Sequence, residues 1–180
     1  MLYISINYKP IKMKKIILFV GLFIGLMACD QPTGNHSDFE ENKEIAKKFI
    51  QLHEVEDYKT QESLLHNDLL WQPPVYGAPQ YGKAEHVEAM KMYQTMFDNL
   101  TYEAENWLPG VNAETGMLDG SVRTYGTWKG THTESGKSFS LTSYHTMDFK
   151  EGKIVAGGDY FDFGGFMASF IPEEEIEVSE

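Results

Sequence analysis

The sequence contains a single cysteine, Cys29, among its 180 residues. One cysteine cannot form an intramolecular disulfide, and it cannot supply the thiolate clusters that hold structural zinc. The six histidines show no metal-ligand spacing, and no H-E-x-x-H pattern, G-x-S-x-G turn or glycine-rich phosphate loop is present. These absences argue against the best-marked metal-dependent and serine-nucleophile enzymes, so we expect no metal and no cofactor.

Basic side chains are also scarce. The chain has 15 lysines and arginines against 27 acidic residues, which gives a net charge of −12. Residues 1–29 hold four lysines and no acidic residue, so the remainder carries −16, which is −12 less the +4 of that segment. Such an acidic body repels phosphate backbones, and we therefore expect no nucleic-acid partner.

An apolar run over residues 16–28 follows Lys14 and Lys15 and stops at Cys29. It has the length of a signal-peptide core and is short for a membrane span. Its ending, Leu-Met-Ala-Cys, resembles the lipobox of bacterial lipoproteins, which implies cleavage before Cys29 and diacylation of its sulfur, for example with palmitate. Further acyl chains matter because one chain holds a protein to a bilayer only marginally. An ordinary secretory signal or an uncleaved anchor is the alternative.

We therefore expect a lipoprotein signal peptide over 1–28, a polar tether over 29–37, and a protein anchored to the membrane outside the cytoplasm, on the periplasmic side or at the cell surface. A folded domain is expected over 38–170, followed by an acidic tail over 171–180.

Helical periodicity changes to strand alternation near residue 100. Apolar spacing predicts helices over 38–54 and 83–99, and Asp57 can cap a short helix between them. A short strand is expected at 69–71. The later predicted strands cover 102–108, 117–132, 138–149 and 153–163, with turns at Ser135-Gly136 and Glu151-Gly152. This order predicts an α+β fold in which helices pack in the concavity of a curved antiparallel sheet.

Three segments carry a family resemblance: "EGKIVAGGDYFDFGGF", "DLLWQPP" and "YGKAE". Together with the element order they resemble the nuclear transport factor 2-like superfamily, and within it the SnoaL-like polyketide cyclases. The resemblance implies a cone-shaped α+β barrel, also called cystatin-like, with a pocket between a curved antiparallel sheet and a long helix. The superfamily includes isomerases, cyclases, dehydratases, epoxide hydrolases and members without known activity, so it leaves open whether this chain is an enzyme. It also implies a homodimer formed through the open sheet.

Alternation in the strand 139–149 places its odd-numbered residues on the buried face, and two of these, Ser143 and His145, are polar. If Glu151-Gly152 forms the turn, Phe149 pairs with Ile154. The register then places His145 opposite Gly158, Ser143 opposite Tyr160, and Leu141 opposite Asp162. A one-residue bulge would reverse these assignments.

The preceding hairpin, with its turn at 134–137, places Gly126 opposite His145 and Trp128 opposite Ser143. Trp128, Ser143, Tyr160 and Asp162 would then share the buried face with His145. Such an apolar surface with a few inward polar groups is typical of a small-molecule pocket.

These positions give a hypothesis for the site. Asp162 is expected to act as a base, with His145 or Tyr160 positioning or protonating the substrate, whereas Asp159 should face outward. Trp71 and Tyr76 would line the opening, as the resemblance implies for the positions around Trp71. The expected ligand is small and mostly apolar. Two alternatives stay open: a His145 that is only a hydrogen-bonded core residue, and a non-catalytic interaction module.

Overall fold

The computed structural model describes residues 36–172. The predicted signal peptide, Cys29 and nearly all of the predicted tether lie outside the described residues, as does most of the acidic tail. Within the described part of the chain, no helix is both long enough and apolar enough to cross a membrane.

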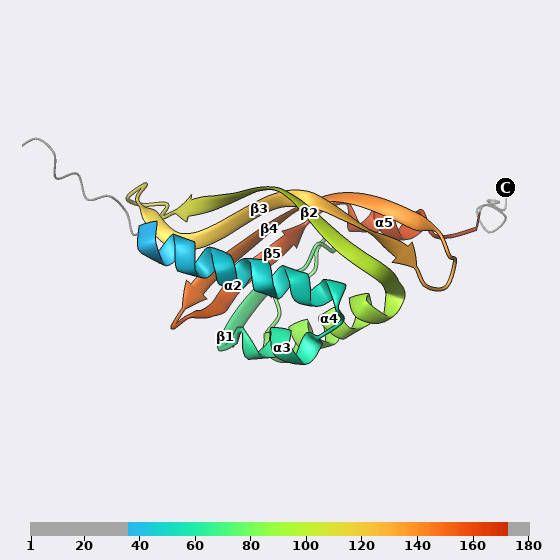
Figure 1. Ribbon diagram of the computed structural model, residues 1–180, viewed down its shortest axis with the longest axis horizontal. Helices are drawn as coiled ribbons and strands as arrows, with labels where there is room; N and C mark the ends of the chain where they lie inside the picture. Colours follow the sequence, from blue (N-terminus) through green and yellow to red (C-terminus); the bar gives the residue numbers. More distant parts are fainter. Residues whose placement is uncertain (1–35, 173–180) are drawn as a thin grey trace, which may run out of the picture. The chain divides into compact units, whose positions relative to one another are not determined.

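Four helices and one five-stranded sheet build the described domain (Figure 1). The helices are α2 (His36–Glu54), α3 (Tyr58–Ser63), α4 (Lys83–Met96) and α5 (Phe163–Ala168). The strands are β1 (Leu65–Gln72), β2 (Phe97–Val111), β3 (Leu118–His132), β4 (Ser138–Lys150) and β5 (Lys153–Tyr160). Their order in the sheet is β1-β5-β4-β3-β2, and only the β1–β5 pair is parallel. The predicted α+β class with a curved sheet is confirmed.

Several elements differ from the sequence prediction: β1 begins at Leu65 instead of residue 69, α4 ends at Met96 instead of residue 99, and the ends of β2 and β5 also differ. Strand β2 continues through Pro109 and Gly110 to Val111, beyond the predicted end at residue 108. A proline is tolerated there because β2 is an edge strand and needs no ladder hydrogen bond on its open side. Strand β5 ends at Tyr160, and Asp162 begins the short helix α5 by accepting a hydrogen bond from the backbone N–H of Gly165 at 2.9 Å.

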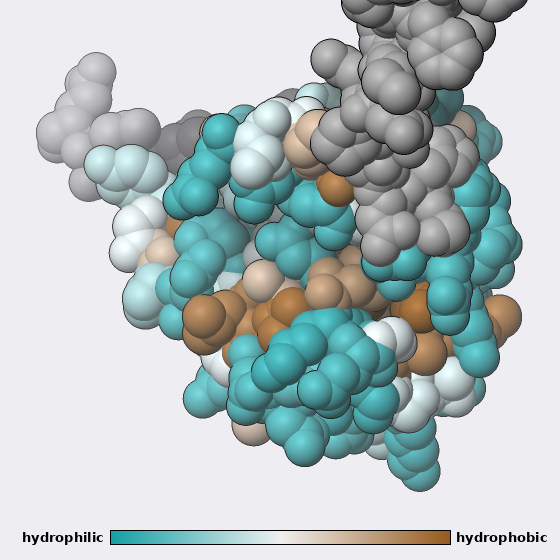
Figure 2. All heavy atoms as spheres, turned by 90° about the vertical axis from the view of Figure 1, so that its left-hand side faces the viewer, coloured by the Kyte–Doolittle hydropathy of each residue, from teal (hydrophilic) through white to brown (hydrophobic). Residues whose placement is uncertain are grey.

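The core lies between the helices and the concave face of the sheet. Helix α2 runs across that face, with α3 and α4 beside it (Figure 1). Its buried residues Phe39, Ala46, Phe49 and Ile50 recur at helical spacing. The three larger side chains, Phe39, Phe49 and Ile50, each contribute about 1.5–3 kcal/mol to the free energy of folding when they leave water. The space-filling view shows hydrophilic side chains over most of one end of the molecule, with hydrophobic side chains in a band between them (Figure 2).

A β-bulge at Val155 sets which side chains of β5 face the core. Phe149 pairs with Ile154, as predicted, but Asp148 pairs with Ala156, so Val155 has no partner on β4. Beyond the bulge every pairing moves by one residue. The predicted partners of β4 on β5 past this point are therefore wrong, because a one-residue shift turns each following side chain to the opposite face.

The β3–β4 register also differs from the prediction, but by two residues. Thr124, rather than Gly126, pairs with His145, and Gly126 pairs with Ser143. Since a shift of two preserves the alternation, Trp128 and His145 still share the concave face, as predicted.

Glycine at position 157 permits a close approach between two strands. A Cβ atom there would contact the indole carbon Cζ3 of Trp71 and would lie 2.5 Å from the carbonyl oxygen of Thr146. The bare backbone therefore gives the Trp71 ring its place against β5. This packing aims the indole N–H along the strand toward residue 159.

Candidate functional site

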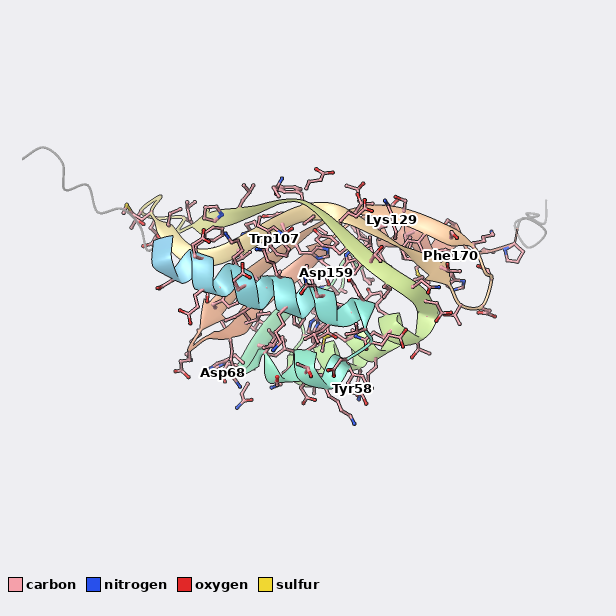
Figure 3. The ribbon with its side chains drawn as sticks, in the orientation of Figure 1. Tyr58, Asp68, Trp107, Lys129, Asp159 and Phe170 are labelled. Carbon is pink, nitrogen blue, oxygen red and sulfur yellow. The ribbon has the colours of Figure 1, made fainter. Side chains whose placement is uncertain are left out.

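The bulge brings Asp159 onto the concave face, where it lies between α2 and the sheet (Figure 3). Its Oδ1 atom lies 2.7 Å from Nδ1 of His145, and its Oδ2 atom accepts a hydrogen bond from Nε1 of Trp71 at 2.9 Å. The side chains of His145 and Asp159 are only 8% and 17% exposed to solvent, respectively. Strands β1, β4 and β5 therefore jointly hold a buried carboxylate–imidazole pair.

The other ring nitrogen of His145 faces two groups on the sheet. Nε2 lies 3.0 Å from Nε1 of Trp128 and 2.8 Å from Oγ of Ser143. An indole N–H can only donate, so Nε2 must keep a lone pair to accept this bond. The proton of the neutral imidazole is then on Nδ1, where it is donated to Asp159.

Burial has the largest effect on the pKa of Asp159, which it raises. Hydrogen bonding to His145, the positive charge that His145 and His86 gain on protonation, and the hydrogen bond from Trp71 all lower it. Together these groups hold the pKa of Asp159 below its usual value, so the carboxyl group is ionised at neutral pH.

Two adjoining cavities meet at this pair. The outer cavity measures about 80 Å³ and the inner one about 40 Å³. Five residues line both: His53, Tyr93, Trp128, His145 and Asp159. The walls of the outer cavity are largely hydrophobic, which is the usual composition of a small-molecule site.

Two further histidines face the inner cavity from the helices. His53, in the last turn of α2, packs edge-on against Trp128 with ring centroids 5.6 Å apart. His86, on α4, is 4% exposed and stacks on Trp71 at 4.1 Å. Burial lowers the pKa of each histidine to about 4, although Asp159 partly opposes this effect. Both rings are therefore neutral at pH 7.

Among residues 36–172, no group of three or more His, Cys, Asp or Glu side chains is arranged to hold a metal ion. The site instead combines one carboxylate with neutral imidazoles and aromatic rings.

Three of the sequence-predicted residues lie away from the cavities. Asp162 is exposed at the start of α5, and Tyr160 is 47% exposed on the outer face of the sheet beside Tyr144. The bulge at Val155 explains the error at Tyr160, which the predicted register placed inward. The error at Asp162 arises because β5 ends at Tyr160 and Asp162 caps α5. Tyr76 is fully exposed in the loop after β1 and is not among the residues that line either cavity.

Four other predicted residues come together. Trp71, Trp128, Ser143 and His145 all lie on the concave face, joined by the hydrogen bonds given above. Asp159, for which an outward position was predicted, replaces Asp162 as their carboxylate partner. Asp159 is in direct contact with His145, whereas Asp162 lies apart from it at the start of α5.

Ser143, His145 and Asp159 have the atom connectivity of a serine hydrolase triad, with Oγ on Nε2 and Nδ1 on the carboxylate. A nucleophile must reach the substrate, however, and Ser143 is 3% exposed and lines neither cavity. Its hydroxyl therefore serves as a hydrogen-bonding partner of the imidazole. This arrangement favours proton transfer over acyl transfer.

Sequence analysis missed His53 and His86. A signal for both was present, because His53 follows Phe49 by four residues and His86 precedes Met90 by four. This spacing places each histidine on the same helical face as a buried apolar residue. Neither spacing, however, indicates that the two helices meet at one cavity.

Comparisons with solved structures place this geometry in a known fold. An NTF2-like protein of unknown function from Burkholderia pseudomallei is 17% identical, with a TM-score of 0.59, and the match covers 73% of this chain and 98% of that one. A protein from Catenulispora acidiphila with a ketosteroid isomerase-like fold, solved in complex with trimethylamine, is 14% identical, with a TM-score of 0.59 over 73% and 95% of the two chains. The fold is NTF2-like.

An LEH-like epoxide hydrolase from M. tuberculosis is 16% identical, with a TM-score of 0.54 over 73% of this chain and 90% of that one. An epoxide hydrolase/cyclase-like enzyme with a role in pyran ring formation in the polyether salinomycin is also 16% identical, with a TM-score of 0.58 over 69% of this chain and 92% of that one. No protein-family model matches the sequence, and no curated protein is significantly similar to it. The likeness is therefore one of fold, and the chemistry must be argued from the site.

Proposed function

We propose that this NTF2-like domain binds a small, mostly apolar molecule in the two adjoining cavities and transfers a proton to or from it without a cofactor. The observation that carries the proposal is the contact between His145 and Asp159 at the junction of the cavities. Isomerisation and cyclisation both require such proton transfers. Solved proteins of this fold that act as epoxide hydrolases or cyclase-like enzymes support an enzymatic role.

His145 is the proton carrier in this proposal. Asp159 holds the proton on Nδ1 and stabilises the imidazolium that forms when Nε2 accepts a second proton. Trp128 and Ser143 donate hydrogen bonds to Nε2 and so orient the ring. These bonds break when Nε2 accepts a proton from the substrate. Asp159 itself is a weaker base, because its two oxygens already accept hydrogen bonds.

The binding half of the proposal predicts that small lipophilic molecules stabilise the protein. A cavity ligand at a hundred times its Kd adds about 2.7 kcal/mol, which raises Tm by several degrees. A thermal-shift panel is expected to show this rise for the native chain and for the control Tyr76→Ala, but not for Trp128→Ala or His145→Ala. A flat response of the native chain, with protein partners recovered by pull-down, would favour the interaction module.

The chemical half can be tested with 5-nitrobenzisoxazole, from which a base removes a carbon-bound proton while the ring N–O bond breaks to release a coloured phenolate. We expect the native chain to exceed the buffer rate by about a hundredfold, the contribution of a positioned base. His145→Gln should abolish the excess, and Tyr160→Phe should retain it. Retention of the excess by His145→Gln would contradict the assignment.

A second role is favoured by the outer face of the sheet. Tyr125, Tyr144 and Tyr160 stack in a row across β3, β4 and β5, with ring centroids 4.5 and 5.6 Å apart. Tyr125 and Tyr160 remain 43% and 47% exposed. We propose that this face joins two copies of the chain. Sedimentation velocity should show a dimer that Tyr125→Ser with Tyr160→Ser converts to monomer; a native monomer at micromolar concentration would refute it.

We also propose that the domain is tethered to a membrane through acylated Cys29, on the evidence of the lipobox-like sequence. Intact-mass measurement of protein extracted from membranes should give a chain that begins at Cys29 and carries acyl mass. Cys29→Ser should abolish that mass and release the protein. A mature chain that begins at another residue would exclude the lipid anchor.

A further inference from the structure

The two cavities carry charge of one sign. Asp159 is the only carboxylate among the residues that line them, and within the described part of the chain no lysine or arginine reaches either lining. His145 is neutral in the tautomer that its hydrogen bonds require, and burial keeps His53 and His86 neutral at pH 7. The negative charge of Asp159 therefore has no cation opposite it in the cavity.

His86 marks an incomplete hydrogen-bonding site. Both of its ring nitrogens are buried and have no hydrogen-bond partner among the described residues, and the residue is only 4% exposed. A buried unpaired polar atom is costly, and in native proteins it usually indicates a missing water, ion or ligand. The inner cavity that His86 lines measures about 40 Å³, enough for one small polar group.

The outer cavity is lined by six aromatic side chains: Tyr93, Phe97, Trp128, Phe139, Phe161 and Phe166. Aromatic faces attract cations as well as hydrocarbon, and proteins recognise quaternary ammonium ligands with cages of aromatic rings. A carboxylate beside such rings adds a charge of the opposite sign. Neutral imidazole and carboxylate groups at the inner end accept hydrogen bonds, which an ammonium group can donate.

We propose that the cavities bind a small organic ammonium ion, with its nitrogen beside Asp159 and His86 and its hydrocarbon part among the rings of the outer cavity. This inference rests on the proposed small-molecule function and adds the chemical class of the ligand. An anion would be repelled by Asp159, and a neutral molecule would leave that carboxylate without a cationic partner.

Three probes of matched shape test the ligand class. Cyclohexylammonium, cyclohexanol and cyclohexanecarboxylate differ mainly in charge, and their binding to the full chain can be measured by titration calorimetry at pH 7. We expect the ammonium to bind at least about tenfold more tightly than the alcohol, and the carboxylate to bind most weakly. Asp159→Asn should remove the preference, whereas the control Asp68→Asn, at an exposed carboxylate on β1, should keep it.

Each outcome decides something. If the alcohol or the carboxylate binds the native chain as tightly as the ammonium, the ligand class is wrong and the proposed cavity stands. If none of the three binds while lipophilic molecules still raise Tm, the ammonium proposal fails alone. If no small molecule binds at all, both proposals fail. The comparison within the native chain remains decisive if Asp159→Asn does not fold.

Discussion

Asp159→Asn is expected to lower the free energy of unfolding at pH 7 by about 1–3 kcal/mol, the cost of one buried donor left unpaired. The native carboxylate accepts N–H groups from two sides, Trp71 and His145. Asparagine offers one oxygen and one NH₂ group, so in either orientation it opposes one of these donors with another donor. Urea denaturation measures the loss.

The pH dependence of this loss follows from the pKa of Asp159, which is lower in the folded than in the unfolded chain. The stabilisation is fully present above the pKa that Asp159 has in the unfolded chain, about 4. It is lost as pH falls through the lower pKa that Asp159 has in the folded chain. The difference between the native chain and Asp159→Asn should therefore be largest near neutral pH and shrink in acid.

The matched control is the same substitution at Asp162, the carboxylate that the sequence predicted as the base of the site. Asp162→Asn keeps a side-chain oxygen for the α5 cap and should change stability by less than about 0.5 kcal/mol, because Asn and Asp are similar N-caps. Nitrogen NMR of His145 should show the proton on Nδ1 in the native chain and in Asp162→Asn. Equal stability of Asp159→Asn and the native chain, with that tautomer unchanged in both, would remove Asp159 from the site.

His86→Phe is expected to make the protein less sensitive to acid. The pKa of His86 is about 4 in the folded chain and about 6.5 when unfolded. Between these two pKa values His86 binds a proton in the unfolded chain but not in the folded chain. The free energy of unfolding therefore falls as pH decreases from about 6.5 to 4. His86 by itself accounts for about 3 kcal/mol of that loss, at 1.36 kcal/mol per pKa unit.

Phenylalanine can keep the stacking on Trp71, and it removes two buried nitrogens that have no hydrogen-bond partner within residues 36–172. At pH 7.5 the variant should therefore be as stable as the native chain or more stable, and at pH 4.5 it should exceed the native chain by about 2–3 kcal/mol. Denaturation at the two pH values separates titration from packing, since a packing change acts equally at both. An identical pH dependence in the two proteins would show that His86 does not titrate as described.

Both predictions concern residues whose roles were invisible or misjudged in the sequence. His86 appeared as one of several unconnected histidines, and Asp159 was expected to face solvent. Their importance comes from a meeting of α4, β1, β4 and β5, whose residues lie far apart in the chain.

The local spacing of apolar and polar residues was enough to locate two of the helices and to assign several strand side chains to the concave face. Alternation in β4 placed Ser143 and His145 inward, and the same parity in β3 brought Trp128 to their side even though the register was two residues off. Helical spacing located α2 and α4, and Asp57 caps α3 as expected. These features depend on neighbours within a few residues, which the sequence contains explicitly.

Only the tertiary structure decided which carboxylate serves the site. One extra residue at Val155 turns Asp159 inward and Tyr160 outward, and nothing in the local sequence distinguishes a bulge there from a regular strand. The bond from Trp71 to Asp159 requires the parallel pairing of β1 with β5, across 88 residues of chain. Such choices are made by the packing of the whole core, because each register buries a different set of side chains and the chain adopts the one that satisfies them together.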